Sequence, residues 1–273
     1  MININGNFFS NLDSLDIKKH IFIINNTNFC EEIHFENGLL FFWEYHFFRI
    51  MASLRRLRFE IPVSFNKDFL EKEVIRTINT NNLNKKSINV KFNFYSNLYK
   101  KNVDYIIYIN ESKSYDKIIS THSHLSDIYN EELINPGLLS NLSITNKVIR
   151  EIANIYAIEN GIDSCIILNN KKNIVESTRG TIYLIKKNKI ITPNLLSGCQ
   201  NTAIRSSFND WINKQKTNFI LEEININVYE LQQCNELFLL SINQGYTSVS
   251  KYRKTFFLNN KGGKIFKDFI SSI

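Results

Sequence analysis

The chain has 273 residues, of which 43% are hydrophobic, 13% aromatic and 22% charged. Such a chain can bury the core of one large domain or two medium ones, and its composition argues against a long disordered tail. The formal net charge of +7 would suit nucleic-acid binding, but the lysines and arginines are scattered, and no nucleic-acid-binding motif accompanies them. We interpret the charge as a solvated surface and expect no nucleic-acid partner.

The cysteines and the apolar runs bear on the compartment. The four cysteines lie far apart, with no Cys-x-x-Cys pair, and the asparagine-rich N-terminus carries no secretory signal, so we expect a cytoplasmic protein. The longest apolar runs, near Leu39–Trp43 and Leu237–Ile242, are far shorter than the ~20 residues that span a bilayer. We therefore expect no membrane insertion.

The first hundred or so residues predict a mixed domain of sheet and helix. Apolar side chains recur on one helical face between Glu44 and Phe59, and Pro62 closes that segment. The elements expected here are strands at Ile21–Ile24 and Gly38–Trp43, helices at Glu44–Phe59 and Phe69–Ile78, and alternating strands at Ile88–Phe94 and Val103–Ile109.

The periodicity weakens between about Glu111 and Asn135, where serine, aspartate, histidine and asparagine accumulate. We expect a small α/β domain over 1–115, a connector over 116–135 and a second domain over 136–273. The connector contains His122 and His124, a spacing that can ligate zinc on a strand, but no third ligand stands nearby in the sequence. We interpret the two histidines as connector residues and expect no metal.

The second half predicts a helix followed by hairpins. Two apolar triplets, spaced from Val148 to Tyr156, predict a helix that Thr145 could cap and Gly161 could end. The later elements are expected at Cys165–Asn169, Ile174–Glu176, Thr181–Ile185 and Lys189–Thr192 as strands, around Ile204–Ile212 as a helix, and at Glu236–Ile242 and Val249–Tyr252 as strands.

The most specific pattern lies in these hairpins. It reads Asn-Ile-Val-Glu176-Ser-Thr-Arg-Gly, then Ile-Thr-Pro193, then Gly198-Cys-Gln-Asn-Thr202-Ala203-Ile204-Arg205. In order and spacing it resembles the signature of class-IV aminotransferases, the fold-type IV pyridoxal phosphate (PLP) family. The run Phe42-Trp-Glu-Tyr-His-Phe-Phe-Arg49 resembles the phosphate-arginine helix of that family, and Cys234-Asn-Glu-Leu-Phe-Leu-Leu-Ser241 resembles its late strand. The resemblance extends from about Ile21 to Arg253.

The resemblance implies an α/β (α+β) fold with a small α/β N-terminal domain, a larger pseudo-barrel C-terminal domain, PLP held between them and a homodimer. It assigns Glu176 to the ring nitrogen, which a carboxylate keeps protonated so that the ring can withdraw electrons. It assigns the cofactor phosphate to Arg49, to the backbone N–H groups of Thr202, Ala203 and Ile204, and to the hydroxyl of Ser241.

One position departs from the family at a residue that the reaction requires. Counting back from Glu176 places the Schiff-base lysine of the family at Ser143, and a serine cannot form an imine. Lys147 follows one helical turn later, ~5–6 Å along the axis, and would approach the cofactor from another direction. Ser143 could instead be only a helix-entry residue.

Other positions have drifted as well. Thr202 replaces a glycine of the phosphate loop, which could restrict a backbone that must approach the phosphate closely. Thr181 stands where asparagine is common, and His20–Glu31 lacks the glycine turn and aspartate that precede Phe-Glu in the family. The change at His20–Glu31 affects the wall beside the substrate, and the losses together indicate relaxed catalytic constraint.

The sequence therefore predicts an aminotransferase class IV-like protein in which ordinary PLP transamination is lost, with PLP bound non-covalently or lost and an amino acid or other small molecule as ligand. The alternative is an active amino-acid transaminase or aminodeoxychorismate-lyase-like enzyme that uses Lys147 or an amine of the substrate.

Overall fold

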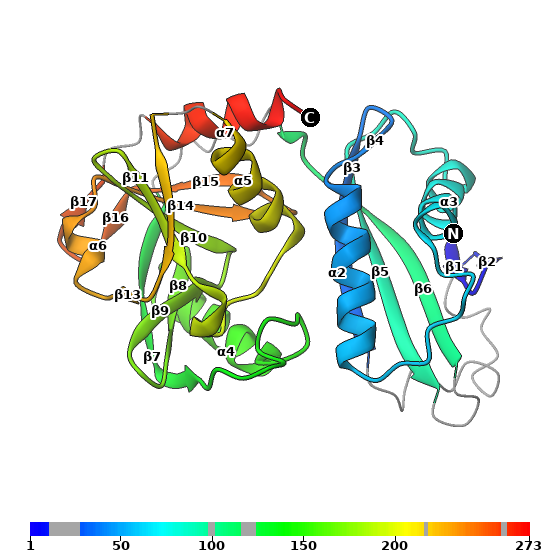
Figure 1. Ribbon diagram of the computed structural model, residues 1–273, viewed down its shortest axis with the longest axis horizontal. Coiled ribbons are helices and arrows are strands. Elements are labelled where there is room, and N and C mark those ends of the chain that lie inside the picture. Colours follow the sequence, from blue (N-terminus) through cyan, green and yellow to red (C-terminus); the bar gives the residue numbers. More distant parts are fainter. Residues whose placement is uncertain (11–27, 98–101, 116–123, 216–217, 258–260) are drawn as a thin grey trace. The chain divides into compact units, whose positions relative to one another are not determined.

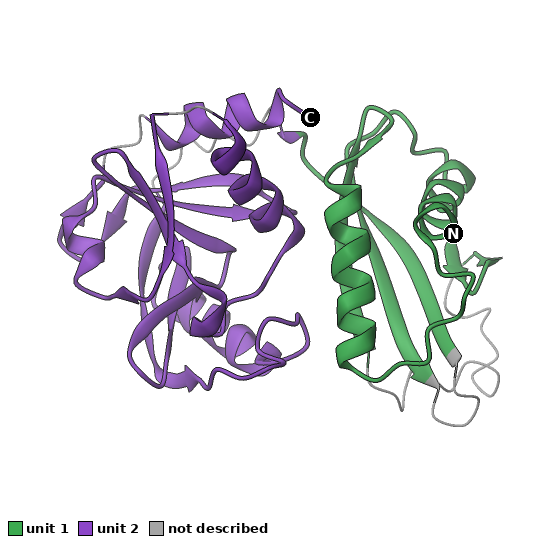
Figure 2. Ribbon diagram, viewed as in Figure 1, with its two compact units in different colours: residues 1–114 green, residues 115–273 purple. Residues whose placement is uncertain are grey.

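The computed structural model describes residues 1–10, 28–97, 102–115, 124–215, 218–257 and 261–273 (Figure 1). The chain divides into two compact units, Met1–Ser114 and Tyr115–Ile273, which are coloured separately in Figure 2. None of the helices in the described part of the chain is long and apolar enough to cross a membrane. The strand expected at Ile21–Ile24 lies outside the described residues.

Unit 1 contains an antiparallel sheet. Its strands, in the order β2-β1-β6-β5-β3-β4, are β2 (Asn7–Phe9), β1 (Ile2–Ile4), β6 (Asn102–Glu111), β5 (Ile88–Asn97), β3 (Asn28–Glu36) and β4 (Leu39–Leu40). Strands β5 and β6 pair from Ile88 opposite Glu111 to Asn97 opposite Asn102, which confirms and lengthens the two alternating strands predicted there. The strand predicted over Gly38–Trp43 shrinks to β4 because Phe42 adopts a left-handed φ of 57° and a helix begins at Trp43.

Two helices pack against this sheet, α2 (Trp43–Arg56) on β3 and α3 (Lys67–Thr80) on β6. The predicted apolar face of α2 is present, with Ile50 and Leu54 fully buried one turn apart. Helix α2 ends three residues before the predicted limit, Phe59, and Arg58 has a left-handed φ of 61°. Helix α3 begins where the side chain of Asn66 accepts a hydrogen bond from the amide of Phe69 at 2.8 Å.

The described residues of unit 2 form two sheets. One has the order β12-β11-β10-β14-β15, with β12 (Ile220–Ile224), β11 (Lys189–Pro193), β10 (Thr181–Lys186), β14 (Glu236–Ser241) and β15 (Gly245–Val249). The other has the order β13-β9-β8-β7-β16-β17, with β13 (Ile226–Asn227), β9 (Asn173–Ser177), β8 (Ser164–Asn169), β7 (Leu125–Ile134), β16 (Lys251–Tyr252) and β17 (Thr255–Phe256).

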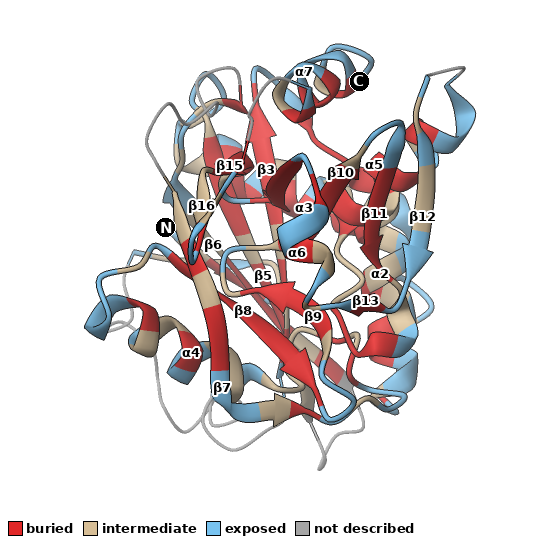
Figure 3. Cartoon of the chain, turned by 90° about the vertical axis from the view of Figure 1, so that its left-hand side faces the viewer, coloured by how far each residue is buried: buried red, intermediate tan, exposed pale blue. Residues whose placement is uncertain are grey.

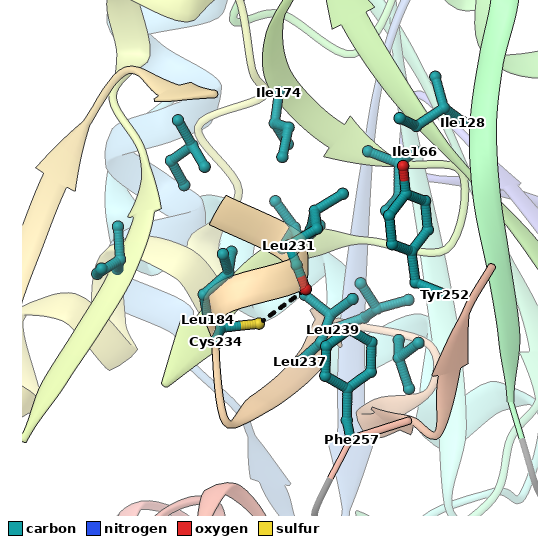
Figure 4. Close-up of a cluster of buried hydrophobic side chains, with 14 of the residues drawn as sticks. Ile128, Ile166, Ile174, Leu184, Leu231, Cys234, Leu237, Leu239, Tyr252 and Phe257 are labelled. Carbon is teal, nitrogen blue, oxygen red and sulfur yellow. Dashed lines mark hydrogen bonds between the residues drawn. The ribbon is translucent and has the colours of Figure 1, made fainter. Parts of the chain in front are cut away.

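The two sheets share one hydrophobic core, shown in part in Figure 4. Leu184, Leu237 and Leu239 from one sheet meet Ile166 and Ile174 from the other, and all are almost fully buried. The short helix α6 (Glu230–Gln233) adds Leu231, whose carbonyl accepts a hydrogen bond from Cys234 Sγ at 3.5 Å. Figure 3 shows the strands β8, β10 and β11 almost entirely in the buried class.

Helix α4 (Lys147–Glu159) covers the opposite face of β7 and β8. Because side chains alternate along a strand, Cys165 and Ile167 of β8 face this helix while Ile166 faces the shared core. The helix contributes Ala153 and Ala157 to that contact. One of the two apolar triplets predicted for this helix is exposed instead, namely Val148, Ile152 and Ile155.

An aromatic layer lies on the sheet that contains β10 and β14, on the face turned away from the shared core. It joins this sheet to helices α5 (Ala203–Lys214) and α7 (Gly262–Ile270). The rings of Tyr183 and Phe238 stack with centroids 5.1 Å apart, and Phe208 of α5 meets Tyr183 edge to face at 5.2 Å. Phe269 of α7 contacts Phe208 at 5.3 Å. This packing fixes the position of α5, whose first turn belongs to the candidate site.

Further features differ from the sequence-based expectation. Residues 125–134, placed in the connector, form strand β7, since Ile128, Tyr129 and Ile134 are buried in the sheet. Helix α4 begins at Lys147 after Asn146, which has a left-handed φ of 59° and no capping side chain, so Thr145 is not the cap. Helix α7 and strand β3 were not predicted.

Candidate functional site

Three segments of unit 2 meet beside the start of α4: the turn at 137–146, the end of β9 and the loop that leads into α5. Asn141 ties the turn to the loop, because its Nδ2 donates to the carbonyls of Leu195 at 2.9 Å and Cys199 at 2.7 Å. The amide of Asn201 donates to the carbonyl of Asn141 at 3.3 Å. These contacts hold the segment that carries Ser143 against the loop that carries Thr202.

Glu176 lies at the end of β9 and is only 4% exposed. Its Oε2 accepts a hydrogen bond from the backbone amide of Gln200 at 3.0 Å. Its Oε1 accepts a hydrogen bond from Nε of Arg150, with which it forms an ion pair. Both oxygens of the carboxylate that was assigned to a cofactor ring thus have donors from the chain.

Arg150 reaches this carboxylate from the first turn of α4. It stands three residues before Ala153 and seven before Ala157, so it lies on the stripe of the helix that packs against β8. Its Nη1 donates to the carbonyl of Thr145, just before the helix. Its Nη2 is buried and has no hydrogen-bond partner in the part of the chain that the structure describes.

Ser143 and Lys147 occupy different environments. Ser143 is half-buried in the turn that precedes α4. Lys147 is the first residue of α4, its side chain is 67% exposed, and its amine pairs with Glu151 one turn later at 3.6 Å. The amine of Lys147 is therefore engaged on the exposed side of the helix, whereas Arg150, three residues on, is engaged with Glu176.

The first turn of α5 is a capped helix start that carries backbone N–H donors. Thr202 is the N-cap, and its hydroxyl accepts a hydrogen bond from the amide of Arg205 at 3.3 Å. The amides of Ala203 and Ile204 begin the helix, where no carbonyl of the same helix can accept from them. Thr202 has an ordinary extended conformation with φ −74°, so this position does not need the left-handed backbone that favours glycine.

Hydroxyl groups gather next to this helix start. Thr181 Oγ1 lies 3.5 Å from Thr202 Oγ1, and Thr181 pairs with Leu240 across β10 and β14. Ser241 follows Leu240, and its hydroxyl accepts a hydrogen bond from the amide of Gln244 at 3.1 Å. The structure therefore brings Thr202, Ala203 and Ile204 close to the end of β14 that carries Ser241.

Arg49 belongs to unit 1. It lies on α2, its guanidinium forms an ion pair with Glu31 of β3, and it stands over the ring of Phe29 at 5.5 Å. Glu31 is 1% exposed and also contacts Nδ1 of His46 at 2.5 Å. The pair fixes the orientation of Arg49 on the sheet of unit 1.

Burial shifts the pKa of two further side chains in unit 2. Burial raises the pKa of the Cys199 thiol to about 11, with a smaller opposing effect from Arg205. Burial lowers the pKa of His124, whose Nε2 contacts Ser164 Oγ at 2.9 Å. His122 lies outside the described residues, and within the described ranges no three histidine, cysteine, aspartate or glutamate side chains cluster as metal ligands would.

Sequence reasoning did not identify Arg150, Asn141 or the amide of Gln200 as parts of this site. Backbone donors and carbonyl acceptors carry no sequence signal. The sequence did carry a signal for Arg150. This cation stands three residues before Ala153 and seven before Ala157, so it lies on the same packed stripe of the helix. An arginine at such a position needs a buried acceptor, and Glu176 was already singled out.

The residues of this site fit a PLP cofactor at one end only. The α5 amides with the hydroxyls of Thr202 and Ser241 suit a phosphate. At the ring end the fit fails, because Ser143 offers no amine and the charge of Glu176 is already paired with that of Arg150.

Solved structures with the same fold include three of interest. The branched-chain amino acid aminotransferase of Escherichia coli matches with a TM-score of 0.83 and 16% identity, covering 99% of this chain and 92% of that one. The PLP form of the branched-chain amino acid aminotransferase of Thermobaculum terrenum matches with a TM-score of 0.80 and 17% identity, covering 99% of this chain and 92% of that one. A putative 4-amino-4-deoxychorismate lyase of Legionella pneumophila matches with a TM-score of 0.76 and 22% identity, covering 92% of this chain and 91% of that one.

These likenesses establish the fold, which is the predicted α/β fold of type IV with a small α/β domain and a larger pseudo-barrel domain. A search of curated proteins found no match. A family model, described as amino-transferase class IV, matches residues 28–252. The match spans well over half of the chain and includes the turn of Ser143, Glu176 and the α5 helix start, so the chain belongs to the class-IV aminotransferase family.

Proposed function

We propose that this chain is an aminotransferase class IV-like protein that has lost ordinary PLP-dependent transamination and retains the fold to bind a small molecule, such as an amino acid or a phosphorylated compound. The observation that carries the proposal is Ser143 at the position that the family pattern gives to the Schiff-base lysine. The nearest amine in sequence, that of Lys147, is exposed and paired with Glu151.

The chemistry explains why this substitution matters. The lysine of such enzymes is a covalent anchor for the cofactor and then moves a proton between the substrate and the cofactor. A serine hydroxyl is not an amine, and it is not a base at neutral pH. The reaction therefore loses both the anchor and the proton carrier by one substitution.

The retained helix start favours continued ligand binding. The amides of Ala203 and Ile204, with the hydroxyls of Thr202 and Ser241, form a donor set that suits a phosphate or a carboxylate. Under this proposal PLP is held non-covalently or has been replaced by another ligand. The proposal also includes a homodimer in the cytoplasm, in keeping with the expectations from sequence.

The second candidate is an active enzyme, either an amino-acid transaminase or an aminodeoxychorismate-lyase-like enzyme. The donor set at α5 favours it, as does the likeness to the putative 4-amino-4-deoxychorismate lyase. It requires an amine from Lys147 or from the substrate. Lys147 would have to leave Glu151 and reach past the first turn of its own helix.

A turnover assay separates the two candidates. Purified protein is supplied with PLP and a panel of amino acids with 2-oxo-acid acceptors, and separately with aminodeoxychorismate. The proposal predicts product formation no faster than with PLP alone, for the wild type and for Lys147→Ala. Turnover by the wild type that is abolished in Lys147→Ala would establish the second candidate and contradict the first.

A further inference from the structure

Glu176 is a buried carboxylate that needs a partner of opposite charge. It is 4% exposed, and a carboxylate taken out of water stays ionised only beside a cation or several donors. In the class-IV pattern that partner is the protonated nitrogen of the cofactor ring. A chain of this family without a bound ring must stabilise the same charge in another way.

Arg150 supplies the missing charge from within the chain. Its Nε donates to Oε1 of Glu176, while the amide of Gln200 donates to Oε2 at 3.0 Å. Its Nη1 donates to the carbonyl of Thr145, which anchors the guanidinium beside the turn of Ser143. A guanidinium remains charged at every physiological pH, so the pairing is permanent.

We propose that Arg150 is the built-in counter-ion of Glu176 and stands in for the ring nitrogen of a pyridoxal cofactor, so that the carboxylate is closed to a protonated pyridine. The inference rests on the proposed function and deepens it, because it concerns the ring end of the same site. Placing a second cation beside an ion pair that is already neutral would leave an unpaired positive charge in a buried position. A ligand of this site therefore has no positive charge at this end.

Arg150 and Lys147 make a matched pair for a first test. Both are cations in the first turn of α4, but the side chain of Arg150 is 13% exposed and that of Lys147 is 67% exposed. Arg150→Gln is expected to lower the melting temperature by about 10 °C, because it leaves a buried charge without its partner. Lys147→Gln is expected to change it by no more than about 2 °C, because exposed ion pairs contribute little.

Coupling to Glu176 distinguishes a counter-ion from an arginine that merely fills space. Adding Glu176→Gln to Arg150→Gln is expected to restore most of the lost melting temperature, since no charge then remains to be paired. An Arg150→Gln protein that folds only when Glu176→Gln is also present would support the proposal equally. Simple addition of the two single effects would overturn it.

Ligand binding provides the second test, with PLP itself and its 1-deaza analogue, in which a C–H replaces the ring nitrogen. Equilibrium dialysis measures both without any turnover. Arg150→Gln is expected to bind PLP at least about tenfold more tightly than the wild type, a modest effect for one uncovered buried charge. The gain should be absent for the analogue and absent in Arg150→Gln/Glu176→Gln.

Equal affinity of the wild type and Arg150→Gln for PLP, including no binding by either, would overturn the proposal. Neither test depends on a Schiff base or on any other covalent adduct. Their failure would leave the loss of transamination standing, whereas turnover by the wild type would remove the proposed function without changing the coupling between Arg150 and Glu176.

Discussion

Gly180 allows strand β10 to approach β14 at the edge of the candidate site. Its φ is 148°, a conformation that residues with a side chain rarely adopt. A Cβ at this position would lie 2.4 Å from the carbonyl oxygen of Leu240 and 3.1 Å from Cβ of Ser241. The neighbouring Thr181 and Ser241 therefore depend on a residue without a side chain between them.

Gly180→Ala is expected to lower the free energy of unfolding by more than about 2 kcal/mol, because the backbone is strained and the clash is with backbone atoms. The control is Gly161→Ala, at a φ of 65° with nothing within 4 Å of the added Cβ, which is expected to cost about 1 kcal/mol. Urea denaturation measures both. Equal losses in the two variants would show that no close approach constrains Gly180.

Individual candidate site residues were chosen from the sequence where the family pattern fixes a spacing. Glu176, Thr202 and Ser241 were identified that way, and the structure places Thr202 and Ser241 in one region of unit 2. The partner of Glu176 was not predictable from that pattern, because the pattern specifies a cofactor there and this chain places Arg150. The capping role of Thr202 was not anticipated, since the sequence argument considered only how this residue affects the approach of the backbone to a phosphate.

At the scale of elements, periodicity identified segments that have one apolar and one polar face. Helix α2 and strands β5 and β6 follow that pattern, whereas β8, β10 and β11 are almost entirely buried and were identified as short apolar runs between turn residues. Strand β7 was not predicted from the sequence. Its exposed residues 130–132 are polar or charged and adjacent, so the buried positions on either side do not form a regular alternation. In α4 two apolar faces were predicted and only one is buried, since packing against β8 uses the face of Ala153 and Ala157.

At the scale of the whole molecule, buried thiols link stability to alkaline pH. Burial raises the pKa of Cys199 to about 11 and that of Cys234 to about 12, whereas a thiol in the unfolded chain titrates near about 8.5. Above that pH the unfolded chain binds fewer protons than the folded one. Stability is therefore complete below about pH 8.5 and declines as the pH rises towards the folded-state pKa values.

Each of these thiols contributes a slope of at most about 1.4 kcal/mol per pH unit. We expect these two thiols to lower the free energy of unfolding by about 4 kcal/mol between pH 8.5 and 10.5, measured by urea denaturation in the presence of a reductant. A Cys199→Ala/Cys234→Ala variant should show a shallower decline over the same interval. A pH profile identical to that of the wild type would mean that the two thiols are accessible to solvent in the folded protein.

The proposed loss of the Schiff-base lysine, with Ser143 at its position, is tested most directly by borohydride reduction in the presence of PLP, followed by peptide mass mapping. Wild-type protein should show no reduced PLP adduct on Lys147 and no change in its visible spectrum beyond that of PLP with a denatured control. The Ser143→Lys variant serves to show whether restoring the amine restores the adduct. A stoichiometric adduct on Lys147 of the wild type, lost in Lys147→Ala, would contradict the account.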